Sequence, residues 1–199
     1  MKKKSVFIIF FIFLLISMAI TVNAVNTQKN LANKVIRLHI IANSDSKVDQ
    51  EIKLKVRDEI IKELSPMLVK ATNIAESREI IFSNIRNIEK IANVTLKKYC
   101  DYTASAILTQ SNFPTKNYNN ISFPAGEYEA LKVTIGEGKG KNWWCVMFPP
   151  LCFTNSSISF SDESIETLKQ NLSNEEFELI SSKTPKVKVK FKILELFNK

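Results

Sequence analysis

Few residues of this chain could do chemistry. His39 is the single histidine of the sequence, and the three cysteines are Cys100, Cys145 and Cys152. One imidazole excludes a zinc site built from several histidines, and neither a C-x-x-C nor an H-E-x-x-H motif occurs. A hydrolase that acts on cell-wall material through His39 or Cys145 is the alternative to a non-catalytic role. Nothing in the flanking residues favours that chemistry, so we expect no catalytic residue, no cofactor and no metal ion.

The composition changes between residues 124 and 152. This window holds all four glycines and both tryptophans, with a glycine-rich stretch at residues 136–140 shortly before Trp143 and Trp144. The stretch precedes a β-like aromatic run, so we interpret it as a hairpin tip and not as a phosphate-binding loop. Adjacent tryptophans in a strand point to opposite faces, so at most one can serve a one-sided core. We expect this run, including Phe148, to contact a protein or a membrane interface, and burial beneath the preceding phenylalanine-containing loop is the alternative.

A second group of candidate binding residues surrounds a predicted strand-to-helix junction. Its members are Arg37, His39, Asn43, Ser44 and Asp45. The strand is predicted at residues 35–41, where alternation places Arg37 and His39 on one face and Leu38 on the other. Polar groups at the carboxyl end of a strand and at a helix N-terminus favour a ligand or partner site. The alternative is structural, because the three turn residues can hydrogen-bond the turn and the helix start while His39 is satisfied inside the fold.

The N-terminus predicts export. Three lysines at residues 2–4 precede an apolar run at residues 6–22, and the compact residues that end at Ala24 suit a signal peptidase. We therefore predict a signal peptide at residues 1–24. An uncleaved membrane anchor is the alternative, because the apolar run is close to the length of a membrane span. Both outcomes leave residues 25–199 outside the cytoplasmic membrane as a single domain, since the lysines stay inside.

The charge that remains after export is modest. Loss of the three N-terminal lysines lowers the net charge from +8 to +5, and only four of the 28 basic residues are arginines. Phosphate and base-edge recognition favours the planar guanidinium group of arginine, so we exclude nucleic acid as a partner. We expect membrane contact only through the N-terminal segment or at a membrane-bound partner.

An exported chain with three cysteines leaves one of them without a partner in the same chain. Six residues separate Cys145 from Cys152, and among them Pro149-Pro150 disfavours a sharp return of the chain. We still expect these two cysteines to form a disulfide, which would stabilise the fold by about 2.5 kcal/mol by restricting the unfolded chain. Cys100 would then be a buried free thiol.

Predicted helices and strands must position these residues. Apolar residues recur at every fourth position over residues 47–64 and Pro66 follows, which predicts a helix that ends there. The other expected elements are a helical region at 74–98, a strand at 102–109, a hairpin of strands 128–135 and 143–148, helices at 162–171 and 174–182, and an alternating strand at 186–193. This order predicts an α+β domain with a mixed, largely antiparallel sheet of about five strands and helices packed mainly on one face.

Two blocks of the sequence resemble a known family. The first block is IRLHIIANSD at residues 36–45 followed by DQEIKLKVRD at residues 49–58. The second block is FPAGEYEAL at residues 123–131 followed by IGEGKGKNWWCVMFPPLCF at residues 135–153. In this order, and behind an export segment, the two blocks resemble the stage II sporulation protein R family.

The resemblance implies a developmental signal in an endospore-forming bacterium. Members of the family are made in the forespore and exported into the space between the forespore and mother-cell membranes. There they trigger a membrane-embedded aspartic protease of the mother cell, which cleaves the inactive precursor of sigma factor E. The resemblance thus implies that the chain activates a protease and is not itself an enzyme. We accordingly expect Trp143, Trp144, Phe148 and residues 37–45 to form the surface that meets the receptor protease.

Overall fold

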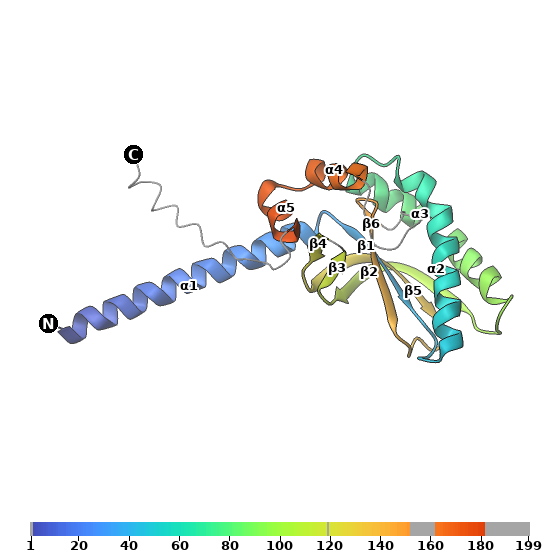
Figure 1. Ribbon diagram of the computed structural model, residues 1–199, viewed down its shortest axis with the longest axis horizontal. Helices are drawn as coiled ribbons and strands as arrows, with labels where there is room; N and C mark the ends of the chain where they lie inside the picture. Colours follow the sequence, from blue (N-terminus) through green and yellow to red (C-terminus); the bar gives the residue numbers. More distant parts are fainter. Residues whose placement is uncertain (1, 119, 152–161, 182–199) are drawn as a thin grey trace.

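The computed structural model describes residues 2–118, 120–151 and 162–181 (Figure 1). Its elements in chain order are α1 (Lys2–Ala32), β1 (Ile36–Ile41), α2 (Lys47–Leu68), α3 (Ile74–Leu96), β2 (Ala104–Phe113), β3 (Lys116–Tyr118), β4 (Ile121–Phe123), β5 (Gly126–Ile135), β6 (Asn142–Phe148), α4 (Asp162–Asn171) and α5 (Asn174–Ser181). The strand expected at residues 186–193 lies outside the described residues. The helices and strands confirm the predicted α+β class.

Four strands form the main sheet of the described residues, in the order β2-β5-β1-β6. Strand β1 pairs parallel with β5 and antiparallel with β6, and β2 pairs antiparallel with β5, so the sheet is mixed and mostly antiparallel. The predicted hairpin of β5 and β6 is wrong, because β1 lies between them. Their connection crosses the end of β1, where the N–H of Gly140 donates to the carbonyl of Ala42 at 2.9 Å.

Glycine is required where this connection crosses β1. A Cβ atom on Gly140 would collide with the carbonyl group of Ser44, and Gly136 and Gly138 have φ angles of 57° and 61°. Residues with side chains rarely adopt such left-handed angles. The glycine cluster therefore allows the chain to cross from β5 to β6, which are not neighbours in the sheet. Its predicted place at the tip of a hairpin is wrong.

Helices α2 and α3 cover one face of the sheet (Figure 1). On this face Ile36, Leu38 and Ile40 of β1 pack in one core with the every-fourth-residue stripe of α2, which includes Val56 and Ile60. We call this cluster the first core. The predicted alternation of the first strand is confirmed, because Arg37 and His39 lie on the opposite face.

Helix α2 is longer than expected. It continues through Pro66 and ends at Leu68, whereas the proline predicted an end near Leu64. A proline in the last turn removes few intrahelical hydrogen bonds. Leu64 and Leu68 are both fully buried, and we infer that this packing outweighs the lost hydrogen bond.

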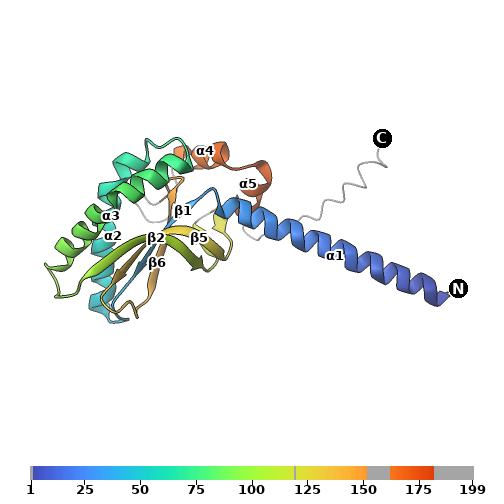
Figure 2. The same ribbon diagram turned by 180° about the vertical axis from the view of Figure 1, so that it is seen from behind.

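The second face of the sheet carries a smaller core of its own, near the place where α5 lies beside the end of α1 (Figure 2). The segment after Phe113 contains the hairpin β3-β4, which packs there together with the end of α1 and with α5. Buried members of this second core include Leu31, Phe123, Tyr128 and Ile180. Because the hairpin is short, it covers only part of the second face.

Helix α1 extends away from the rest of the protein (Figure 1). It is long and apolar enough to cross a membrane, and its apolar side chains between Val6 and Leu15 are exposed. These properties are consistent with a signal sequence and hence with export. The helix continues without a break past Ala24, and its last turn packs Leu31 into the second core. Cleavage after residue 24 stays a prediction.

Candidate partner-binding site

Strand register brings part of the predicted site together on the second face of the sheet. Ile107 of β2 pairs with Lys132 of β5, and Lys132 pairs in turn with His39 of β1. His39 pairs with Trp144 of β6. These four residues form one line across all four strands, which we call the cross-strand row. Arg37 lies on the same face, two residues before His39 along β1.

Arg37 is fully buried in an aromatic cage. Its guanidinium carbon lies 4.0 Å from the ring centre of Phe113, 4.8 Å from that of Tyr128 and 5.6 Å from that of Phe123. Its Nη2 donates to Tyr118 Oη at 3.2 Å, while Nε and Nη1 find no hydrogen-bond partner in the described parts of the chain. Burial lowers the pKa of Arg37, and the interaction with Tyr118 opposes this shift. Aromatic faces thus take the place of a carboxylate as the main compensation for the buried charge.

Replacing Arg37 with methionine is expected to raise the free energy of unfolding by about 1–3 kcal/mol. A buried cation without an anionic partner is expensive to desolvate, and a methionine side chain can pack against the same rings. Urea unfolding followed by circular dichroism measures the change, with Arg37→Lys as the control that keeps the charge. Loss of stability in the methionine variant would show that the cation–π contacts outweigh the desolvation penalty.

His39 is almost buried, and its surroundings favour the neutral ring. Its Nε2 lies 2.7 Å from Asn142 Oδ1, so that hydrogen bond is satisfied when Nε2 donates. The ring stacks on Trp144 at a centroid distance of 6.0 Å. Burial lowers the pKa of His39 below its ordinary value, the hydrogen bond to Asn142 opposes this, and Lys132 lowers it further. Cys145 packs in the first core on the other side of the sheet, so the structure does not bring it to His39.

The two tryptophans point to opposite faces, as predicted. Trp143 packs at the edge of the first core, with the guanidinium carbon of Arg57 4.9 Å from its ring centre. Trp144 stacks on His39, and Lys116 Nζ lies 4.0 Å from its ring centre. Both side chains are half-buried, so neither tryptophan is wholly interior. Only Trp144 belongs to the cross-strand row.

The three turn residues make hydrogen bonds within the chain, and their role in partner binding stays a prediction. They are Asn43, Ser44 and Asp45. Asn43 Nδ2 and Ser44 Oγ donate to Asp49 Oδ2 at 3.0 Å and 2.5 Å. Asn43 Oδ1 accepts a backbone N–H of the β5–β6 crossover at 3.0 Å, and Asp45 Oδ1 accepts another at 2.7 Å. The hydrogen bonds from Ser44 and Asn43 hold the pKa of Asp49 below its ordinary value of 3.8. These polar groups are therefore already used to tie the β1–α2 turn to the crossover.

Phe148 does not lie on the surface. It is 1% exposed in the first core, so its predicted place on the receptor-facing surface is wrong. The pairing of β1 with β6 shifts register beside it, and this irregularity accompanies the inward position of Phe148. Cys152 lies outside the described residues, so its disulfide with Cys145 stays a prediction. Cys100 is a free cysteine, half-buried and not fully buried as expected.

Sequence reasoning missed three polar residues of the second face. They are Lys116, Tyr118 and Lys132. Lys132 could have been found, because alternation in β5 sets it opposite to Leu131 and Val133, which are in the first core. Strand β3, which carries the other two, has three residues and pairs with β4 instead of the main sheet. Such a short strand leaves no readable alternation in the sequence.

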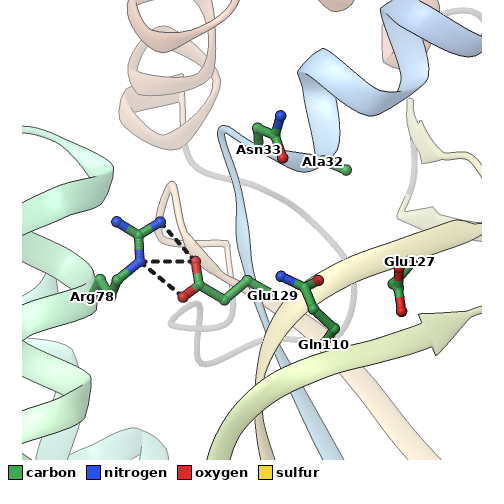
Figure 3. A pocket seen from close by; sticks show the side chains of 6 residues that line it. All are labelled: Ala32, Asn33, Arg78, Gln110, Glu127 and Glu129. Carbon is green, nitrogen blue, oxygen red and sulfur yellow. Dashed lines mark hydrogen bonds and ion pairs between the residues drawn. The ribbon is translucent and has the colours of Figure 1, made fainter.

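A polar depression lies between the end of α1, helix α3 and the strands β2 and β5 (Figure 3). It is lined by Ala32, Asn33, Arg78, Gln110, Glu127 and Glu129. Arg78 and Glu129 point toward each other and form a bidentate ion pair, with Nε–Oε1 and Nη2–Oε2 distances of 2.8 Å. The hydrogen bond to Glu129 raises the pKa of Arg78. These two charges satisfy each other, and the carboxylate of Glu127 is a further charged group in the lining.

Comparison with known proteins agrees with the resemblance of the two sequence blocks. The profile of the family described as Stage II sporulation protein R matches residues 32–158. The chain is 42% identical over 164 residues to the Stage II sporulation protein R of Bacillus subtilis (strain 168), with 78% of this chain and 73% of that protein covered. No solved structure matches the chain significantly. The chain therefore belongs to the stage II sporulation protein R family.

Proposed function

We propose that this chain is an exported sporulation signal that activates a membrane-embedded aspartic protease of the mother cell. That protease in turn cleaves the precursor of sigma factor E. Membership of the stage II sporulation protein R family, matched over residues 32–158, is the observation that carries the proposal. The exposed apolar helix α1 supports export, because lysines followed by an apolar helix are the pattern of a signal sequence. The folded residues would then act in the space between the forespore and mother-cell membranes.

An activating role fits the chemistry of the second face better than a catalytic one. A nucleophile and its base must lie within hydrogen-bonding reach of each other. His39 instead lies between Trp144 and Phe113, with Nε2 engaged by Asn142, and Cys145 lies on the far side of the sheet. These positions argue against the hydrolase alternative, so we propose that the catalysis belongs to the partner.

Preferential binding can explain how a non-catalytic protein switches a protease on. A protein that binds the active arrangement of the protease more tightly than the inactive one shifts the population toward the active form. Moving an equilibrium from about 1% to about 99% active requires about 5.5 kcal/mol of differential binding. A standard interface with one or two buried aromatic or charged anchors can supply this amount.

Production of the full chain with the protease and the sigma factor E precursor in a non-sporulating bacterium tests the proposal. We expect cleavage of the precursor, seen by immunoblot, only when all three proteins are present. A variant that lacks residues 2–24 is the control, since without the export segment the chain stays inside the cell and cleavage should be lost. Absence of cleavage with the exported full chain would contradict the proposal. Release of wall fragments by the purified protein would favour the hydrolase instead.

A further inference from the structure

One part of the second face of the sheet, which we call the open half, carries accessible side chains in the residues that the structure describes. The hairpin β3-β4 packs over the end of the sheet that holds Arg37, whereas the cross-strand row lies toward the other end. Ile107, at the β2 end of the row, is 56% exposed, and Ser105 beside it on the same strand face is also exposed. Lys132 and Trp144 are half-buried. Trp144 packs against the second core on one side, and together with Ile107 it leaves apolar surface accessible in the described part of the chain. Accessible aromatic and aliphatic side chains next to lysines are typical of a surface that meets another molecule.

The charges of this open face all have one sign. Lys132 lies within the row, and the ammonium group of Lys116 stands over the ring of Trp144 at 4.0 Å. Register and alternation place no aspartate or glutamate on this face of β1, β2, β5 or β6. The acidic residues of β5, Glu127 and Glu129, belong to the opposite alternation. The open face is therefore electropositive in the part of the chain that the structure describes.

The charged side chains of the open half are hydrogen-bond donors. The ammonium groups of Lys116 and Lys132 can only donate, and so can the indole Nε1 of Trp144 between them, which is buried without a hydrogen-bond partner in the described ranges. His39 Nδ1, also without a partner there, is an acceptor when Nε2 carries the proton. Carboxylates are acceptors that match both the lysine donors and their charge.

We propose that the open half of the second face binds an acidic polypeptide segment of a partner protein, with Trp144 as the apolar anchor and Lys116 and Lys132 as the charge contacts. The partner's identity as the receptor protease rests on the proposed function. A polypeptide is favoured over an anionic membrane because membrane binding through charge takes clusters of about four to eight cations, and this face offers two lysines. The exposed Ile107 further suits a segment that carries apolar side chains between its carboxylates.

A peptide-binding assay with the purified full chain tests this inference. The probe is a fluorescently labelled synthetic peptide in which glutamate alternates with valine, and the control peptide has glutamine in place of glutamate. Fluorescence anisotropy measures the affinity for wild type and for the double variant Lys116→Glu with Lys132→Glu. The matched control is Lys62→Glu with Lys90→Glu, which reverses two exposed lysines of α2 and α3.

We expect the wild type to bind the acidic peptide more tightly than the glutamine peptide, with an affinity that falls as salt is added. Reversal of Lys116 and Lys132 is expected to weaken binding about tenfold or more, and the control reversal by about twofold at most. The neutral double variant, Lys116→Gln with Lys132→Gln, should lose affinity in part while keeping the wild-type circular dichroism spectrum. That variant separates loss of charge from loss of fold.

Equal binding of both peptides, or an affinity that the reversal leaves unchanged, would overturn the inference. Loss of binding to phosphatidylglycerol vesicles on reversal, without any binding of the peptide, would assign the face to lipid and overturn it as well. The assay does not involve the protease. A chain that binds the peptide as expected but fails to activate the protease therefore contradicts the proposed function and leaves this inference standing.

Discussion

The Asp49→Ala variant is expected to have a free energy of unfolding about 3 kcal/mol below that of the wild type. Asp49 is 6% exposed and accepts hydrogen bonds from Ser44 Oγ and Asn43 Nδ2. Its own N–H donates to Ser46 Oγ at the start of α2, where a carboxylate also suits the helix dipole. Alanine would leave two donors unsatisfied and free the turn that holds the β5–β6 crossover. Urea unfolding of the purified protein measures the loss.

The control for this prediction is Asp45→Ala. Asp45 is exposed and, among the described residues, its side chain accepts one hydrogen bond, from the N–H of Lys141, so we expect a loss of about 1 kcal/mol or less. The pKa of Asp49 is lowered in the fold, so its contribution is complete above the ordinary value of 3.8 and disappears as the pH falls through the native value. A difference between wild type and Asp49→Ala that stays constant down to strong acid would contradict this account.

The Trp144→Ala variant is expected to lower activation of sigma factor E about thirtyfold, which corresponds to about 2 kcal/mol of lost binding. Trp144 is the largest apolar side chain of the cross-strand row, and it is half-exposed on the face that we propose for docking. Its removal also deletes the cation–π contact between the indole ring and the ammonium group of Lys116. A reporter gene under sigma factor E control measures the change in a sporulating strain.

Trp143→Ala is the matched control, because it removes the same side chain from the opposite face of the same strand. Trp143 packs beside the first core and beneath Arg57, so its loss should lower stability while activation per folded molecule changes little. Immunoblots of exported protein correct both variants for abundance. Equal defects after that correction, or normal activation by Trp144→Ala, would remove the second face from the mechanism.

Local patterns in the sequence were sufficient for much of the fold. The every-fourth-residue spacing of apolar side chains predicted α2, because that spacing buries one stripe of a helix. Alternation in the first strand correctly separated Leu38 from Arg37 and His39, because successive side chains of a strand leave opposite faces. The same rule separated Trp143 from Trp144. These patterns depend only on residues close together in the sequence, so they hold for any order of the strands in the sheet.

Such local patterns do not predict which distant segments pair with each other in the sheet. Strands β5 and β6 follow each other in the chain and were expected as a hairpin, yet β1 lies between them. The pairing of β1 with both strands buries Leu38 and Ile40 in the first core, and this burial is a long-range property. The predicted receptor-facing set was divided for the same reason: Trp144 stays on the second face, Phe148 enters the first core, and the turn residues bond to Asp49.

The sequence by itself determined the class of the fold, the apolar export segment and the family. Composition, periodicity and short residue strings can be read from neighbouring residues without knowledge of the fold. Only the tertiary structure decided which side chains share a surface. The register of β1 against β5 and β6 aligns His39 with Lys132 and Trp144, and the hairpin β3-β4 brings Lys116 over that row. Register depends on the burial of a whole face at once, since a shift of one residue exchanges the two faces of a strand.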